Sequence, residues 1–236
     1  MINFFKSEIF KRVISGSILG FCFFYAYIHS ALLFSFILLA ILLIILFFEW
    51  PKLLPSTNRR TISGILKYLF ISFFYPILPI LILIFLNHAY RSQNILFPLY
   101  PFIVSWVGDT GAFILGKLFG KHKICPKISP GKSWEGLFGG FVGILIFNIL
   151  YLPGIYIFPF VAYVKSFLTI ISLSILLTIT GFFGDISISF LKRKNGLKDT
   201  GVLLPGHGGL LDRFDAVFLN AIIIALLIIF SHILSN

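Results

Sequence analysis

The sequence predicts an all-α integral membrane protein with about seven transmembrane helices. Hydrophobic residues make up 58% of the 236 residues and charged residues only 11%, and the mean hydropathy is +1.03. This composition excludes an ordinary soluble protein. Apolar runs that approach the roughly 20 residues needed to cross a bilayer recur along the whole chain. The length fits one integral membrane domain, residues 1–236.

The predicted spans follow from these apolar runs, and they lie near residues 13–28, 31–48, 68–86, 95–116, 136–152, 166–183 and 216–234. Only His29 and Ser30 separate the first two spans, which form either a tight hairpin or a partly re-entrant segment. Glu49 and Trp50 close the second span, as a helix-end acid and an interfacial aromatic. Kinks are expected in the third and fourth spans at Pro76, Pro79, Pro98 and Pro101.

The distribution of positive charge predicts the orientation of these spans. The net charge of +11 permits nucleic-acid binding, but the cations are clustered between spans instead of covering a soluble face. With the N-terminus in the cytoplasm, 17 of the 19 Lys and Arg residues fall on the cytoplasmic side, and only Arg91 and Lys165 do not. The positive-inside rule therefore predicts an N-in, C-out protein whose polar segments face the cytoplasm.

Four of the eight acidic residues fall within residues 181–215, a charged stretch between two apolar runs. Such a stretch is costly beside a membrane and is by default a functional-site hypothesis. Four side chains share one helical face by their spacing of i, i+4, i+7 and i+8: Asp185, Ser189, Lys192 and Arg193. Asp212 and Asp215 share another face at i, i+3. The alternative is a solvated cytoplasmic loop, but topology requires only Lys and Arg, so these acids favour a site.

The chemistry of a phosphate site follows from the same residue types. Four glycines and Pro205 between Lys198 and Gly209 allow sharp turns and a close backbone approach to a ligand. Mg²⁺ prefers one or two carboxylates together with substrate phosphates. A second polar segment begins at Asp109, inside an apolar span, where the carboxylate needs a polar partner. Gly108 and Gly111 flank Asp109 and allow another helix to approach closely.

These residues together resemble the signature of the phosphatidate cytidylyltransferases, also called CDP-diacylglycerol synthases. The resemblance rests on Ser189-x-x-Lys192-Arg193, Lys198-Asp199-x-Gly201 and Pro205-Gly206-His207-Gly208-Gly209-x-x-Asp212-Arg213-x-Asp215. Asp109-Thr-Gly-Ala and Ser129-Pro-Gly-Lys132-Ser133-Trp-Glu-Gly136 resemble further elements of that family. Ile188 stands where family members often carry Glu, so this chain lacks that side chain. The resemblance covers residues 105–217 strongly and divides the domain into N-terminal spans, 1–104, and a catalytic half, 105–236.

The resemblance implies the reaction of CTP with phosphatidate to give CDP-diacylglycerol and pyrophosphate, with Mg²⁺ as cofactor. The implied catalytic residues are Asp185, Asp212, Asp215, Lys132 and Lys198, and the three aspartates among them are the implied metal ligands. The implied substrate-binding residues are Asp109, Ser133, Ser189, Lys192, Arg193, Asp199, His207, Gly208, Gly209 and Arg213. His207 is either a base or a residue that shapes the Gly-rich turn, because a phosphomonoester is already anionic near neutral pH. The expected location is the bacterial inner membrane, and a homodimer is left open.

Two other functions fit parts of this pattern. One is another CTP-dependent lipid enzyme, such as a polyprenol kinase. The other is a metal-ion transporter with intramembrane Asp109 and Asp185. The transporter is disfavoured because the acids are expected at span ends and the loops between spans are basic, which repels cations.

Overall fold

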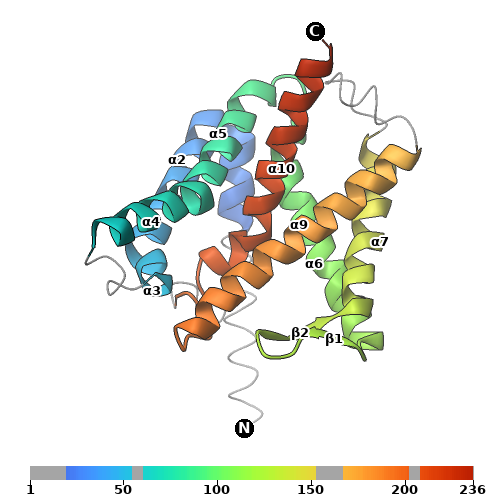
Figure 1. Ribbon diagram of the computed structural model, residues 1–236. Coiled ribbons are helices and arrows are strands. Elements are labelled where there is room, and N and C mark those ends of the chain that lie inside the picture. The colour runs from blue at the N-terminus through green and yellow to red at the C-terminus, as the bar shows by residue number, and fades with distance from the viewer. Residues whose placement is uncertain (1–19, 55–60, 153–166, 202–207, 236) are drawn as a thin grey trace, which may run out of the picture. The chain divides into compact units, whose positions relative to one another are not determined.

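The computed structural model describes residues 20–54, 61–152, 167–201 and 208–235 (Figure 1). Six helical segments among these residues are long and apolar enough to cross a membrane: Ala31–Leu53, Ile62–Tyr90, Phe97–Phe119, Trp134–Tyr151, Phe167–Lys194 and Leu211–Ile233. The prediction of an all-α polytopic membrane protein is therefore confirmed. The expected span at 13–28 lies partly outside the described residues, and residues 20–29 are helical.

Three of the spans contain more than one helical segment. The first comprises α2 (Ala31–Ile44), the π-helical η1 (Ile45–Glu49) and α3 (Trp50–Leu53), and the second α4 (Ile62–Ser72), the π-helical η3 (Phe73–Ile77) and α5 (Leu78–Tyr90). The third begins with the 3₁₀ turn η4 (Phe97–Leu99) and continues as α6 (Tyr100–Phe119). The remaining elements are β1 (Lys123–Cys125), β2 (Ser129–Ser133), α7 (Trp134–Tyr151), α9 (Phe167–Lys194) and α10 (Leu211–Ser235).

The chain divides into two compact units. The first comprises residues 1–88 and 191–214, and the second comprises residues 89–190 and 215–236. The division falls inside α5, α9 and α10, so these helices contribute residues to both units. Each unit is described by its own contacts below.

In the first unit, residues 20–29 and α2 form a tight hairpin. Ser30 separates them in an extended conformation and caps α2 by accepting a hydrogen bond from Leu33 N. The rings of Phe23 and Tyr27 contact that of Phe34 at centroid distances of 5.0 and 4.9 Å. Eleven residues of continuous helix would hold Phe23 and Phe34 about 16 Å apart, so the chain reverses at Ser30. Of the two predicted alternatives, the hairpin is present.

The kink predicted at Pro76, in the expected span 68–86, is present between α4 and α5. The α-helix widens into η3 there, and Tyr75 leaves helical geometry with φ −130° and ψ 39°. Proline removes a backbone donor and clashes with the preceding turn, which accounts for the break. Pro98 and Pro101 do not kink the expected span 95–116, contrary to the prediction. They lie in η4 and in the first turn of α6, where a missing N–H costs no helical hydrogen bond.

In the second unit, α6 and α7 lie side by side through glycines (Figure 1). A Cβ atom at Gly111 would collide with the carbonyl oxygen of Gly139, and one at Gly139 with that of Gly111. A Cβ at Gly140 would lie 3.1 Å from the carbonyl oxygen of Gly108. Small residues that let helices approach this closely are a common membrane packing mode, and the prediction for Gly108 and Gly111 is confirmed.

The polar segment between α6 and α7 is a β-hairpin, which the sequence analysis did not predict. Strands β1 and β2 pair antiparallel, with Lys123 opposite Ser133 and Cys125 opposite Ser129. Trp134 N donates to His122 O at 3.0 Å and extends the pairing to the start of α7. Strand β2 contacts both α6 and α7, so the hairpin holds Lys132 beside these helices.

Buried polar side chains connect helices of the second unit. Asn148 of α7 accepts a hydrogen bond from Tyr100 at 2.9 Å and donates to Ser174 of α9 at 2.9 Å. Asn220 of α10 donates to Ser105 of α6 at 3.0 Å and accepts from Thr180 at 2.6 Å. Interhelical hydrogen bonds of this kind stabilise helix packing where no water competes.

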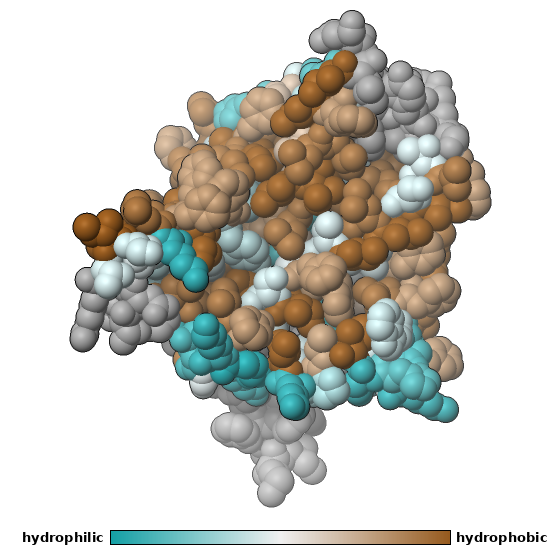
Figure 2. All heavy atoms as spheres, viewed as in Figure 1, coloured by the Kyte–Doolittle hydropathy of each residue, from teal (hydrophilic) through white to brown (hydrophobic). Residues whose placement is uncertain are grey.

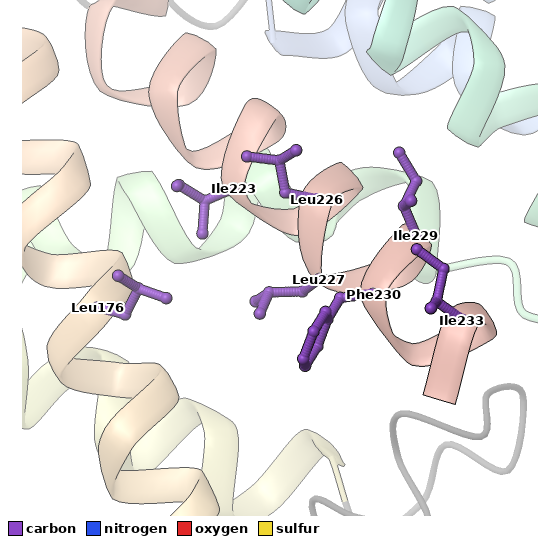
Figure 3. A pocket seen from close by; sticks show the side chains of 7 residues that line it. All are labelled: Leu176, Ile223, Leu226, Leu227, Ile229, Phe230 and Ile233. Carbon is purple, nitrogen blue, oxygen red and sulfur yellow. The ribbon is translucent and has the colours of Figure 1, made fainter. Parts of the chain in front are cut away.

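The outer surface of the helices is apolar. Figure 2 shows hydrophobic residues over most of the visible helical surface, with hydrophilic residues at the β-hairpin and at the C-terminal end of α9. A groove of about 410 Å³ is lined by Leu176 of α9 and six apolar residues of α10 between Ile223 and Ile233 (Figure 3). It contains none of the predicted site residues, and its all-hydrocarbon lining suits a surface that faces lipid.

Candidate active site

The second unit contains an ion pair between two predicted site residues, Lys132 and Asp185. Lys132 Nζ lies 2.5 Å from Asp185 Oδ2, and each side chain is 24% exposed. Ser189, one turn along α9, donates to Asp185 Oδ1 at 3.2 Å. The shared helical face predicted for Asp185 and Ser189 is therefore present. Because α9 continues to Lys194, Asp185 lies inside a helix. The predicted span stopped at residue 183 and had therefore placed Asp185 at the end of the helix.

Three carboxylates influence the ammonium group of Lys132. Burial is the largest single effect and disfavours its charged form, but the attraction and hydrogen bond of Asp185, together with the attraction of Asp109 and Asp215, outweigh burial. The result raises the pKa of Lys132 above its ordinary value of 10.5. Lys132 is therefore a cation in this unit near neutral pH, and Asp109 lies near enough to attract it.

The first unit contains a second ion pair of the same kind. Lys192 Nζ, near the end of α9, lies 2.7 Å from Asp212 Oδ1, and the two side chains are only 11% and 8% exposed. Asp212 Oδ2 accepts hydrogen bonds from Thr200 N at 2.9 Å, Thr200 Oγ1 at 3.0 Å and Gly209 N at 3.1 Å. Four donors thus hold one carboxylate. Asp212 thereby connects the end of α9 to Thr200 and Gly209, which lie in the stretch that carries the family motifs, residues 198–215 (the motif segment).

Glu49 contacts the same segment, although the sequence analysis gave it only a structural role at the end of its own helix. Its carboxylate is fully buried and accepts hydrogen bonds from Leu210 N and Leu211 N, each at 2.8 Å. It therefore caps the N-terminus of α10, not the end of its own helix. Its neighbour Trp50 is also fully buried and donates to Ser72 at 2.7 Å, so its ring packs inside the unit, and its position at a membrane interface stays a prediction.

Other predicted site residues lie along these elements in less constrained positions. Exposed side chains belong to Asp109, Arg193, Lys198, Asp199 and Arg213. Arg193 donates to the carbonyl oxygen of Leu197 at 3.1 Å. Asp215 is buried, and its Oδ1 accepts a hydrogen bond from Ala216 N at 2.8 Å. His207 lies outside the described residues.

Two further predicted residues have local structural roles. Ser133 is buried, and its hydroxyl accepts a hydrogen bond from Gly136 N at 3.2 Å, which caps α7. Gly208 has a φ of +78°, a conformation that favours glycine, and an added Cβ would lie 3.1 Å from Asp212 Oδ2. Both residues thus shape the backbone next to a lysine or aspartate of the ion pairs.

The oxygen ligands available suit a hard cation, but the described residues contain no group of three or more His, Cys, Asp or Glu side chains placed to hold a metal ion. Asp185 and Asp212 each have a lysine as counterion. Mg²⁺ commonly takes one or two protein carboxylates and completes its octahedron with phosphates and water. The residues therefore fit a magnesium ion that arrives with a phosphate ligand, provided that the lysines exchange partners.

Comparison with known proteins gives one consistent result. The model of the cytidylyltransferase family matches residues 13–231. Two proteins named phosphatidate cytidylyltransferase, from Rickettsia bellii and Rickettsia typhi, are each 36% identical over 92% of this chain and over 89% and 90% of their own lengths. A protein of the same name from Staphylococcus haemolyticus is 45% identical over 129 residues, which cover 55% of this chain and 47% of that protein.

Proposed function

Because the chain belongs to the cytidylyltransferase family, we propose that it transfers the cytidylyl group of CTP to phosphatidate, giving CDP-diacylglycerol and pyrophosphate. Relatives that align over about nine tenths of their own length carry the name of this activity. The six candidate spans support a lipid acceptor, because such a substrate stays in the bilayer.

The observation that carries the proposal is the pair of lysine–aspartate contacts formed by motif residues. Lys132 pairs with Asp185 in the second unit, and Lys192 pairs with Asp212 in the first. A reaction between two polyanions needs cations that are held in place, and preorganised charge is the largest catalytic contribution for this kind of chemistry. Each of these two lysines has an aspartate as its counterion.

In the proposed reaction, a phosphate oxygen of phosphatidate attacks the α-phosphorus of CTP. The bond from that phosphorus to the β-phosphate bridging oxygen breaks, and pyrophosphate leaves with its electron pair. Lys132 and Lys192 exchange their carboxylate partners for phosphate oxygens of the substrates, and the exposed Arg193, Lys198 and Arg213 add positive charge. No general base is required, because the attacking phosphate is already anionic near neutral pH.

Mg²⁺ is part of this proposal, with Asp185, Asp212 and Asp215 as its ligands. When bound, the ion neutralises charge on the phosphates of the nucleotide. In the described residues the Asp212 carboxylate has Lys192 as its counterion at Oδ1 and three hydrogen-bond donors at Oδ2, so an ion held by Asp212 would replace the ammonium group of Lys192 at Oδ1.

The location and assembly of the enzyme are proposed on the sequence. The cation distribution supports an N-in, C-out protein of the bacterial inner membrane whose site faces the cytoplasm, where CTP is available. A homodimer stays a proposal that size measurements in detergent would test.

A product assay with the purified protein tests the proposed function. The purified protein is incubated with CTP, phosphatidate and Mg²⁺, and lipids are identified by mass spectrometry. CDP-diacylglycerol and an equal amount of pyrophosphate are expected. A phosphorylated lipid together with CDP would indicate a kinase, and the absence of a lipid product would leave transport as the function.

Asp185→Asn tests the metal assignment in the same assay. The amide oxygen still accepts from Ser189, but the variant loses the counterion of Lys132, so turnover is measured per folded molecule and should be lost at every Mg²⁺ concentration. Near-normal turnover of Asp185→Asn with an unchanged Mg²⁺ requirement would contradict the assignment of Asp185 as a ligand. Ser172→Ala on the same helix is the matched control and should keep its activity, because the Ser172 hydroxyl donates to the backbone oxygen of Leu168 in the preceding turn.

A further inference from the structure

Glu49 is a buried acid that the proposed reaction does not use. It lies at the end of η1, with 0% exposure, and about 160 residues of sequence separate it from the backbone that it contacts. Oε1 accepts from Leu210 N and Oε2 accepts from Leu211 N, both at 2.8 Å. These amides belong to the start of α10, where backbone N–H groups have no partner within the helix. The carboxylate satisfies two of them and complements the helix dipole.

Two motif glycines leave the space that this carboxylate occupies. A Cβ atom at Gly201 would lie 2.8 Å from Glu49 Oε1. A Cβ at Gly209 would collide with the hydroxyl oxygen of Thr200 and would lie 2.8 Å from both carboxylate oxygens of Glu49. A larger residue at 201 would therefore displace the carboxylate, and one at 209 would displace the Thr200 hydroxyl, the carboxylate or both.

Thr200 connects Glu49 to Asp212. Its hydroxyl oxygen lies 3.0 Å from Glu49 Oε2 and 3.0 Å from Asp212 Oδ2. A hydroxyl has one hydrogen and donates it to one carboxylate at a time, so the two acids compete for this donor. The backbone amide of Thr200 also donates to Asp212. A displacement of Glu49 therefore changes both the hydrogen bonding of Asp212 and the start of the helix that carries it.

We infer that Glu49 is a positioning residue, which acts through Thr200 and the first turn of α10 to hold Asp212 for cytidylyl transfer. The inference rests on the proposed function. A helix cap with no catalytic consequence would affect only folding, whereas the Thr200 bridge couples Glu49 to the orientation of one carboxylate. Asp212 should then respond to changes at Glu49 even when the fold is intact.

Glu49→Gln is the direct test, because it keeps the size of the side chain and removes one acceptor. Whichever oxygen becomes the amide nitrogen, that nitrogen faces an N–H donor, either Leu210 or Leu211. The expected result is a kcat about 10- to 100-fold lower, in the range for residues that orient a catalytic carboxylate, with KM for both substrates changed less than threefold. Thr200→Val should lower kcat similarly, and Thr200→Ser, which keeps the hydroxyl, should restore it.

Asn87→Ala is the matched control. Asn87 is fully buried in the same unit and donates to Ala31 O and Ser35 Oγ, away from the motif segment. This variant should lose thermal stability without a selective loss of kcat per folded molecule. If Glu49→Gln keeps kcat within twofold, or loses activity only in proportion to its folded fraction as Asn87→Ala does, Glu49 is not a positioning residue.

Hydrogen–deuterium exchange separates this inference from the proposed function. Amides of Leu210 and Leu211 should exchange faster in Glu49→Gln and stay protected in Asn87→Ala, a result that does not depend on any substrate. Unchanged exchange at these amides would overturn the inference. Wild-type protein that lacks cytidylyl transfer would contradict the proposed function, whatever the exchange experiment shows.

Discussion

Removing the charge of Asp212 should destabilise the protein through Lys192. The two groups lie 2.7 Å apart and are about nine tenths buried, so their gross attraction is about 6 kcal/mol at an effective dielectric constant of about 20. Loss of solvation offsets much of that attraction, but leaving one partner alone costs about 3–5 kcal/mol. Asp212→Asn places an amide nitrogen or a single carbonyl oxygen against the ammonium group of Lys192.

Lys192→Met should cost less, about 1–2 kcal/mol, because Asp212 keeps its hydrogen bonds from Thr200 and Gly209. The double variant should be close to Lys192→Met, which gives a coupling energy of about 3–5 kcal/mol, equal to the cost of Asp212→Asn alone. Thermal unfolding of the four proteins in one detergent measures this cycle, and Asp212→Asn alone should lower the midpoint by roughly 10 °C. If the two changes add to within about 0.5 kcal/mol, the ion pair does not stabilise the fold as described.

Two other predictions follow from charge and from glycine packing. The raised pKa of Lys132 means that the stability from its pairing is complete below pH 10.5 and is lost only as pH rises through the higher folded-state value. The stability difference between wild type and Lys132→Met should thus stay constant from pH 6 to 9, and a change within that range would refute the assignment. Gly139→Ala should cost about 1–3 kcal/mol, because its Cβ meets Gly111 O and Leu115. Gly20→Ala, which has open space, should be neutral in the same unfolding assay, and an equal loss in both variants would contradict close packing of α6 and α7.

Local features of the fold followed from the sequence because their causes are local. The spacing of Asp185 and Ser189 places them one turn apart, and the structure has the corresponding hydrogen bond. Proline at 76 predicted a break that is present one residue earlier, at Tyr75. Gly108 and Gly111 predicted a close helix approach without identifying the partner, and α7 supplies it.

The features that the sequence did not reveal depend on contacts between distant segments. The role of Glu49 depends on amides about 160 positions away, and no periodicity in the sequence connects them. The signal for this contact in the sequence was the pair of glycines at 201 and 209, because glycine at these positions leaves room for a carboxylate. The β-hairpin at 123–133 lacks alternating apolar residues, and it packs against α6 and α7, a contact that the local sequence does not show. The extension of α9 to Lys194 was missed because hydropathy falls at Asp185, although the cations in its last turn favour the helix C-terminus.

The most direct measurement follows which phosphorus of CTP enters the lipid. Purified protein receives phosphatidate and Mg²⁺ with CTP labelled either at the α- or at the γ-phosphorus, and the lipid is extracted and counted. Cytidylyl transfer predicts label in the lipid from α-labelled CTP only, with the γ-label recovered as pyrophosphate. Lipid labelled from the γ-position, or no labelled lipid from either, would contradict the account.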